Sequence, residues 1–377
     1  MTNFRTLVPD HVQKLDSYKP GKPLRQAEWE SGVRCIKLAS NENPFGPSPL
    51  AIEAIRAATS DSHFYPDNGV VELTARLAEI HEIDPSEILV TAGSTTFLDI
   101  IARTLLGPGL NAVTSKLSFI VYPIVTQATG AHLIEVPTLN DGYDLEGILA
   151  AIDGNTRVVY LANPNNPTGT VLDAGAIDRF LDRVPAHAIT VLDEAYYDFA
   201  QHFAAERGLD YSHSLDYVRA ERPVIVLRTF SKAQGLAGLR VGYGMGPAEL
   251  MSYFARMKPA FMVSSLGETA ALAALADEDH VKRAVENNAA GAKLLIPAIT
   301  EMGIRVVPTW SNFLFCRAGE DAPALCQLLQ EDGVIVRPMT GPWRAPDAFR
   351  VTIGTPDQNE QFLSALKRAR ARVPILK

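Results

Sequence analysis

The chain has 377 residues, of which 47% are hydrophobic and 21% are charged, and its formal net charge is −8. This balance is typical of a globular protein and excludes a disordered or fibrous one, while the length predicts two domains or one large domain with a lobe. Because an acidic surface repels phosphate backbones, we do not expect nucleic acid as a partner.

Seven apolar segments rich in Val, Ile and Leu are predicted to be buried strands, since each is bounded by turn residues. In chain order they cover residues 87–93, 111–116, 132–137, 156–163, 188–197, 223–231 and 239–246. Amphipathic stretches of helical length lie between many of them, such as 94–106 and 173–184. Alternating strands and helices predict an α/β region over about residues 50–265, with a largely parallel sheet covered on both faces.

The C-terminal third predicts a smaller second domain. A long helical pattern near 265–300 precedes three segments with strand character, 304–317, 333–339 and 348–355. We expect residues 1–48 to form an N-terminal arm and part of the small domain, 49–270 the large cofactor-binding domain, and 271–377 the small C-terminal domain.

Three cysteines, Cys35, Cys316 and Cys326, are too few and too scattered for a disulfide framework or a paired-cysteine zinc site, so we expect no metal and a reducing cytoplasm. The N-terminus has mixed charge and no apolar segment of the kind found in secretory signals. No apolar run approaches the ~20 residues that span a bilayer. The expected location is therefore cytoplasmic, without a membrane partner.

Polar residues stand where several predicted strands end, and ligands of open α/β sheets bind outside the carboxyl ends of strands. Asn166 follows the strand at 156–163, Asp193 ends a strand, and Lys232 follows the strand at 223–231. The turn at 93–95 leads from a strand into a helix. We therefore look for the functional site at these strand ends.

The loop RTFSKAQGLAGLRVGYGMG, residues 228–246, contains Lys232 among small residues, with Arg240 eight positions later. A dinucleotide site would require G-x-G-x-x-G, which GYGMG does not match, and no Gly-Lys-Ser/Thr P-loop occurs in the chain. A lysine amine forms a Schiff base with a carbonyl when desolvation or nearby cations lower its pKa. Covalent chemistry at Lys232 is the favoured interpretation, and a solvated surface lysine is the alternative.

Two further motifs have a structural and a functional interpretation. The two X-Pro turns of ANPNNPTG, residues 162–169, predict a rigid platform that aims the Asn166 amide outward, although a tight turn alone also explains them. Asp193 lies among apolar residues, where its burial would be costly unless a cation or a protonated ring nitrogen faced it. A helix cap or an ion pair is the alternative.

The motifs NPNNPTG, DEAYYDF, TFSKAQGLAGLRVGY and FRVTIGT, in this order and at these separations, closely resemble those of fold-type-I aminotransferases that use pyridoxal 5′-phosphate (PLP). The best match is the histidinol-phosphate aminotransferase branch, and SNENPFGPSP, FYPD and LDSYKPGKP extend the resemblance over nearly the whole chain. It implies an α/β PLP-dependent transferase fold of type I, with a mostly parallel seven-stranded sheet sandwiched by helices and a smaller α/β domain.

The resemblance also implies roles around the cofactor ring. Lys232 would form the Schiff base with PLP and later move the proton at the substrate Cα. Asp193 would pair with the pyridinium nitrogen and keep the ring protonated. Tyr196 and Asn166 would hydrogen-bond the phenolic oxygen, and Phe119 would stack on the ring.

A phosphate site follows from the same resemblance, made of a helix N-terminus, hydroxyls and a guanidinium. Its residues would be Gly93, Ser94, Thr95, Thr229, Ser231 and Arg240. Tyr65, in FYPD, would add its phenol from the neighbouring subunit, so a homodimer would be required for a complete site.

For the substrate, Arg350 matches the arginine that clamps the α-carboxylate, with a surface ion pair as the alternative. Asn166 would also contact the substrate, and Tyr18 matches a tyrosine near its distal end. In the loop GPWRAP, Trp343 would favour an aromatic or imidazole side chain and Arg344 could meet a phosphate or carboxylate, so the role of this loop is open.

Taken together, the resemblance implies an enzyme that moves an amino group between histidinol phosphate, or an aromatic amino acid, and 2-oxoglutarate by a ping-pong mechanism, in histidine biosynthesis. The alternatives are an aromatic amino acid aminotransferase with no role in histidine synthesis, and a PLP-dependent decarboxylase or lyase on the same fold. A regulatory protein on a retired scaffold is disfavoured because Lys232, Asp193 and Arg350 are all retained.

Overall fold

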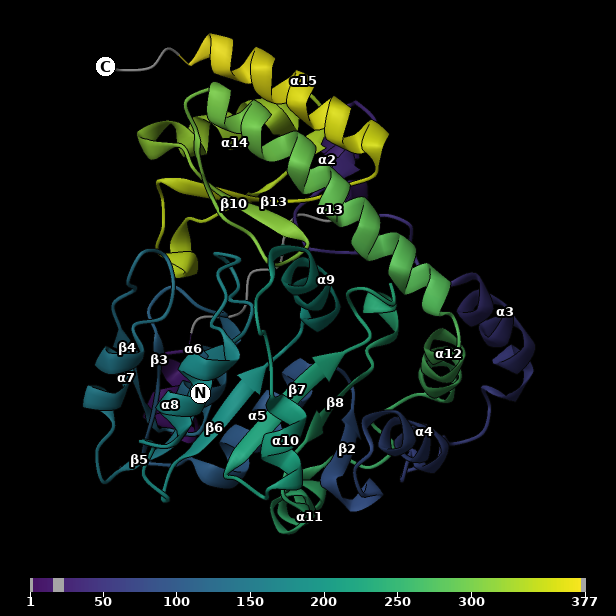
Figure 1. Ribbon diagram of the computed structural model, residues 1–377, viewed down its shortest axis with the longest axis vertical. Helices are drawn as coiled ribbons and strands as arrows, with labels where there is room; N and C mark the ends of the chain where they lie inside the picture. The colour runs from purple at the N-terminus through teal and green to yellow at the C-terminus, as the bar shows by residue number, and fades with distance from the viewer. Residues whose placement is uncertain (1–2, 16–23, 374–377) are drawn as a thin grey trace.

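A computed structural model describes residues 3–15 and 24–373 of the chain. Its largest unit is a seven-stranded sheet in the order β2-β8-β7-β6-β5-β3-β4 (Figure 1). Only β8 runs against its neighbours β7 and β2, and the other pairs are parallel. The strands are β2 Ile88–Thr91, β3 Asn111–Ser115, β4 His132–Val136, β5 Thr156–Ala162, β6 Ile189–Asp193, β7 Val224–Thr229 and β8 Gly242–Met245. Each lies in one of the seven predicted segments, which confirms the mostly parallel α/β sheet.

Both faces of this sheet are buried, because successive residues of a strand belong to different apolar clusters. In β7, Val226 packs in one cluster, and Ile225 and Leu227 pack in the other. The covering helices are α3 Pro49–Ala58, α4 Val71–His81, α5 Ser94–Leu105, α6 Val121–Ala128, α7 Leu145–Ala151, α8 Ala174–Leu181, α9 Tyr197–Arg207, α10 Ser214–Arg219, α11 Ala248–Met257 and α12 Ser265–Leu275. Burial on both faces explains why these strands read as continuous apolar runs rather than alternating ones.

A smaller body at the top of Figure 1 contains a four-stranded antiparallel sheet in the order β12-β13-β10-β9. Its elements are α2 Leu24–Ser31, β1 Ile36–Lys37, α13 Glu278–Glu301, β9 Arg305–Val307, β10 Phe313–Arg317, α14 Ala322–Glu331, β11 Val334–Ile335, β12 Arg337–Pro338, β13 Ala348–Thr352 and α15 Pro356–Arg372. Because β1 pairs with β11, the part of the chain that precedes the large domain contributes a strand to this body. The domain limits at residues 48 and 270 stay a prediction.

The helical pattern at 265–300 is not one helix. It divides into α12 and α13, because Asp277 starts a new helix by accepting a hydrogen bond from the backbone N–H of His280. An N-cap of this kind satisfies a free donor of the first turn and fixes where the helix begins. The sequence pattern shows the helical periodicity but not this interruption.

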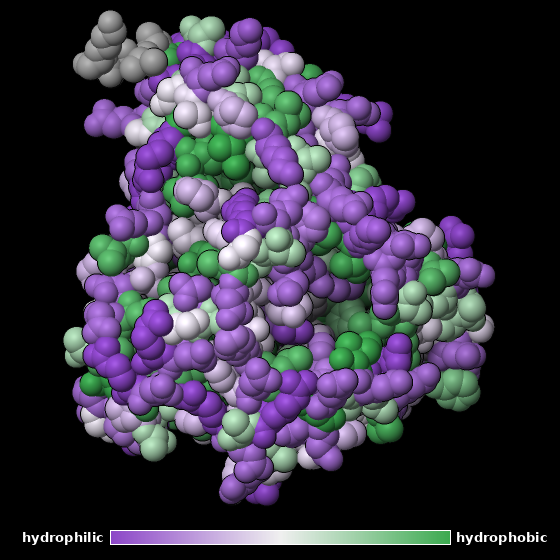
Figure 2. Space-filling model, viewed as in Figure 1, coloured by the Kyte–Doolittle hydropathy of each residue, from purple (hydrophilic) through white to green (hydrophobic). Residues whose placement is uncertain are grey.

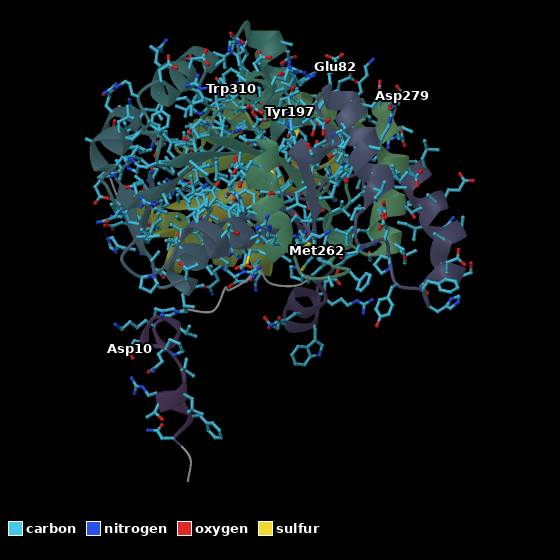
Figure 3. All side chains as sticks on the ribbon, turned by 90° about the horizontal axis from the view of Figure 1, so that it is seen from below. Asp10, Glu82, Tyr197, Met262, Asp279 and Trp310 are labelled. Carbon is cyan, nitrogen blue, oxygen red and sulfur yellow. The ribbon has the colours of Figure 1, made fainter. Side chains whose placement is uncertain are left out.

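The N-terminal segment, residues 3–15, has the 3₁₀ turn Phe4–Leu7 and helix α1 Asp10–Gln13 and projects below the body in Figure 3, where α1 contacts α6. The face drawn in Figure 2 is mostly hydrophilic and is hollowed between α9 and α12, where a cavity of about 220 Å³ is lined by residues of α4, α9 and β8. Among the residues described, no helix combines the length and apolarity needed to cross a bilayer.

Candidate active site

A cavity of about 290 Å³ lies at the carboxyl ends of β5, β6 and β7, between the large sheet and β13. Parallel pairing sets Ala162 beside Asp193, and Asp193 beside Leu227, so these strand ends meet at one edge. The predicted residues that line the cavity are Ser94, Thr95, Phe119, Asn166, Asp193, Tyr196, Thr229, Ser231, Lys232, Arg240 and Arg350. The structure therefore brings most of the predicted site together from segments more than 250 residues apart.

Asp193 is a buried carboxylate at one wall of this cavity. Its Oδ2 accepts a hydrogen bond of 3.0 Å from the Tyr122 hydroxyl, and its Oδ1 accepts one of 3.2 Å from the backbone N–H of Ala195. Burial raises the pKa of Asp193 to about 6, against the effect of both hydrogen bonds and of the Lys232 charge. A buried carboxylate with this pKa favours a cationic partner inside the cavity.

Lys232 follows the end of β7, and its Nζ lies 3.4 Å from the carbonyl oxygen of Ser40. Burial, and after it the positive charges of Arg350 and Arg240, lower the pKa of Lys232 to about 8, although Glu42 and Asp193 oppose the shift. With this pKa roughly a tenth of the amine is neutral at pH 7 and half at pH 8, and the neutral form is the one that attacks a carbonyl.

A chain of hydrogen bonds connects three predicted residues. The Tyr196 hydroxyl accepts hydrogen bonds from Asn41 Nδ2 at 2.8 Å and from Asn166 Nδ2 at 3.3 Å. Arg350 Nη1 donates to Asn166 Oδ1 at 2.5 Å, and Arg350 Nη2 donates to the carbonyl oxygen of Ala39 at 3.0 Å. Each polar group is thereby held in one orientation at the cavity wall.

Two arginines enter the cavity from the small body. Arg350 on β13 is only 5% exposed, which rules out the surface ion pair considered above. Antiparallel pairing places Arg337 of β12 opposite Arg350, and both line the cavity. Two guanidiniums side by side form a site for a carboxylate or a phosphate.

Hydrogen-bond donors that suit an anion lie at the opposite end of the cavity. Ser94 and Thr95 open α5, and Gly93 is its N-cap with a φ of 85°. A Cβ at position 93 would overlap the Arg240 guanidinium, so only glycine allows this approach. Ser231 Oγ accepts hydrogen bonds from Arg240 Nη1 at 3.3 Å and from Thr229 Oγ1 at 3.0 Å.

This donor set has the chemistry that PLP requires. The cavity offers a carboxylate for the ring nitrogen, an amine for the aldehyde and the Phe119 ring as an aromatic wall. The helix N-terminus, hydroxyls and guanidinium at the other end suit a phosphate dianion. The residues present therefore fit the cofactor that the motifs imply.

Two predicted residues are not brought to this cavity within the described chain. Tyr65 is 83% exposed and stacks on Phe261, with 4.8 Å between ring centroids. Tyr18 lies outside the described residues. In the GPWRAP loop, Trp343 lines the cavity, whereas Arg344 lies outside it and pairs with Glu135 at 2.7 Å.

Sequence reasoning missed the segment 39–42, which closes the cavity over Lys232. Asn41 adopts a φ of 57°, and the neighbouring Asn43 donates from Nδ2 to the carbonyl oxygen of Ala233 at 2.7 Å. A Cβ at Gly235 would overlap the backbone of Gly46, so the segment and the lysine loop pack backbone to backbone. The turn-forming residues in SNENPFGPSP were the available signal.

Comparison with known proteins agrees with this geometry. A family profile described as aminotransferase class I and II matches residues 33–366. A histidinol-phosphate aminotransferase of Pseudomonas aeruginosa is 44% identical over 98% of this chain and 100% of its own length. One from Akkermansia muciniphila is 41% identical over 97% of this chain and 99% of its own.

Among solved structures, the histidinol-phosphate aminotransferase of Sinorhizobium meliloti in complex with pyridoxal-5′-phosphate superposes with a TM-score of 0.89. It is 29% identical and covers 97% of this chain and 98% of its own. The profile match spans most of the chain, and the relatives span nearly all of it. The chain therefore belongs to the class I and II aminotransferases, with the PLP-dependent transferase fold of type I.

Proposed function

We propose that this aminotransferase moves an amino group from histidinol phosphate, or from an aromatic amino acid, to 2-oxoglutarate. Its cofactor is PLP, which when bound supplies an electron sink for the bonds at the substrate Cα. The observation that carries the proposal is one cavity lined by the Lys232 amine, the buried Asp193 carboxylate and the guanidiniums of three arginines. The names of the relatives support the choice of amino donor.

In this proposal Lys232 would hold the cofactor through its ε-amine and would move a proton at the substrate Cα. Its pKa of about 8 suits both tasks, because the amine exchanges protons readily near neutral pH. Asp193 would face the ring nitrogen and favour its protonated form. Asn166 and Tyr196 would hydrogen-bond the ring oxygen, and Phe119 would offer its aromatic ring to the cofactor.

The backbone N–H groups at the start of α5, the hydroxyls of Thr229 and Ser231, and Arg240 would hold the phosphate of the cofactor. Arg240 itself has a φ of 56°, which is uncommon for a side chain with a Cβ. The close approach allowed by Gly93 supports this role, because the guanidinium is directed against the helix N-terminus.

The substrate anion binds Arg350 and Arg337 in this proposal. One pair of guanidiniums can take the phosphate of histidinol phosphate and the carboxylate of the keto acid in turn, as a ping-pong reaction in one site requires. Arg344 pairs with Glu135 outside this cavity, so we assign the anion to Arg350 and Arg337, which line it.

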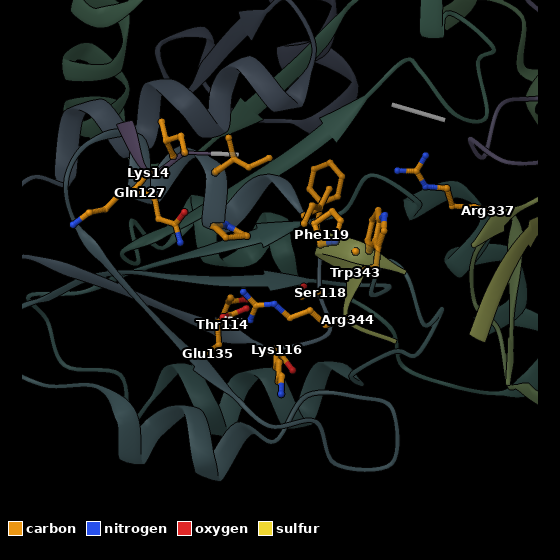
Figure 4. A pocket seen from close by; sticks show the side chains of 17 residues that line it. Lys14, Thr114, Lys116, Ser118, Phe119, Gln127, Glu135, Arg337, Trp343 and Arg344 are labelled. Atoms are coloured by element: carbon orange, nitrogen blue, oxygen red, sulfur yellow. Dashed lines mark hydrogen bonds and ion pairs between the residues drawn. The ribbon is translucent and has the colours of Figure 1, made fainter. Parts of the chain in front are cut away.

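A second cavity of about 390 Å³ adjoins the first and shares Phe119, Arg337 and Trp343 with it. Figure 4 shows the Trp343 ring between Phe119 and Arg337, with Lys14 and Arg344 farther out. Two aromatic rings beside a guanidinium suit a donor with a flat side chain near an anionic group. This arrangement supports histidinol phosphate or an aromatic amino acid over a small aliphatic donor.

We further propose a homodimer in which Tyr65 reaches the phosphate site of the partner. Tyr65 and Trp29 are 83% and 85% exposed, which favours their burial against another surface. The apolar side chains of Phe4 and Leu7 on the projecting N-terminal segment are also exposed. We also propose that the enzyme works in the cytoplasm and in histidine synthesis, and the small number of scattered cysteines agrees with a reducing compartment.

A panel of amino donors tests the function. Purified enzyme would be mixed with histidinol phosphate, histidine, phenylalanine, tyrosine or alanine, and the conversion of the cofactor from aldehyde to amine followed by absorbance. We expect conversion to be fastest with histidinol phosphate or an aromatic amino acid and slow with alanine. Release of carbon dioxide, or preference for alanine, would contradict the proposal.

A further inference from the structure

Tyr122, in the first turn of α6, is completely buried and lies behind the wall of the catalytic cavity. Its hydroxyl donates the 3.0 Å hydrogen bond to Asp193 Oδ2. Its ring stacks on Tyr160, with 4.7 Å between centroids and 5° between planes. The ring of Phe119 meets it edge to face at 5.6 Å. One side chain therefore contacts both the carboxylate and the aromatic wall of the proposed cofactor site.

Tyr122 differs from the other groups around Asp193 in its interaction with the carboxylate. Within the described residues, Tyr122 is the side chain that hydrogen-bonds this carboxylate, and the other donor is the Ala195 backbone. Three other charged or titratable groups lie near Asp193. The Lys232 charge favours the ionised carboxylate, whereas Glu194 and Tyr143 do not. A hydroxyl donor to a buried carboxylate favours its ionised form and fixes its rotamer.

We propose that Tyr122 is a positioning residue, whose hydroxyl keeps the Asp193 carboxylate ionised and aimed into the cavity while its ring supports Phe119. The inference rests on the proposed role of Asp193 and extends it to a residue that does not touch the cofactor. Burial and the Tyr122 hydrogen bond act on the pKa of Asp193 in opposite directions, and the hydrogen bond limits the rise caused by burial.

The test compares Tyr122→Phe with Tyr160→Phe in the apoenzyme. Tyr160 is a matched control because it is equally buried and stacks on Tyr122, but its hydroxyl faces Thr126 and makes no hydrogen bond of ordinary geometry with any described residue. The titration of Asp193 would be followed by infrared difference spectroscopy of isotope-labelled carboxyl groups, with the Asp193→Asn spectrum subtracted.

We expect Tyr122→Phe to raise the pKa of Asp193 by about one unit and to weaken PLP binding by about tenfold. Tyr160→Phe should leave both unchanged. An unchanged Asp193 titration in Tyr122→Phe, or an equal shift in both variants, would overturn the proposal. Thermal unfolding of each apoenzyme checks that the variants are folded.

A second substitution guards against a simple packing effect. Replacement of Tyr122 by 3-fluorotyrosine makes the hydroxyl a stronger donor at nearly the same volume, so the pKa of Asp193 should fall; a rise would contradict the proposal. If Asp193→Asn keeps normal turnover, the proposed function of Asp193 fails, whereas the effect of Tyr122 on its titration is measured independently.

Discussion

Lys232 and Asp193 are the two ionisable residues on which the site depends, and burial moves the pKa of each toward neutrality. The pKa of Lys232 falls to about 8 and that of Asp193 rises to about 6. Both groups are therefore charged at pH 7 but close to changing protonation. In a protein without its cofactor, keeping these charges out of water costs stability, and a bound cationic ring would offset the part that comes from the Asp193 carboxylate.

Asp193→Asn should reduce turnover by several orders of magnitude and yet stabilise the apoenzyme at pH 7.5 by about 1–3 kcal/mol. The folded protein binds the Asp193 proton more tightly than the unfolded chain, whose carboxyl has a pKa of 3.8. Stability is therefore lost as pH rises from about 4 to about 6, and the cost persists above pH 6. Urea unfolding of both apoenzymes at pH 4 and pH 7.5 measures this. The same stability difference at both pH values would contradict the argument.

The attachment of PLP to the apoenzyme should depend on the neutral amine of Lys232. Its rate should rise about tenfold per pH unit below pH 8 and level off above it. Because the Arg350 charge lowers the pKa of Lys232, Arg350→Gln should move the inflection to higher pH. Stopped-flow absorbance against pH measures both curves. An inflection that stays in place in Arg350→Gln would show that the arginine does not act on this amine.

At the scale of elements, the proposed phosphate site depends on the backbone geometry at the start of α5. Gly93→Ala places a Cβ at a φ of 85° and against Arg240, so PLP affinity should fall at least about tenfold. The affinity for pyridoxal, which lacks the phosphate, should fall much less. Gly107→Ala is the matched control, because a Cβ at Gly107 meets open space. Equal losses for PLP and pyridoxal would remove the helix N-terminus from the phosphate site.

The sequence predicted the elements that carry the site better than the contacts between them. Asp193 and Lys232 could be placed because parallel strands end at one edge, and strand ends are visible as apolar runs followed by polar residues. The hydrogen bonds from Asn41 to Tyr196 and from Tyr122 to Asp193 join residues 155 and 71 positions apart. No local pattern encodes such pairings, and the antiparallel register that sets Arg337 opposite Arg350 is equally invisible in one sequence.

For the whole molecule, the proposed dimer predicts complementation between two inactive variants. In a mixture of Tyr65→Ala and Lys232→Ala subunits, half of the dimers are hybrids and each hybrid has one complete site. Activity after unfolding and refolding together should therefore reach about one quarter of the wild-type value. Each variant refolded alone is the control. If the mixture stays as inactive as its parts, Tyr65 does not act across the interface.

The covalent link at Lys232 is the most direct test of the account. PLP-loaded enzyme would be reduced with borohydride and digested, and its peptides mapped by mass spectrometry. We predict that the cofactor mass is found on the peptide containing Lys232 and on no peptide of Lys232→Ala. Cofactor mass on another lysine, or the same amount of bound cofactor in the variant, would contradict the account.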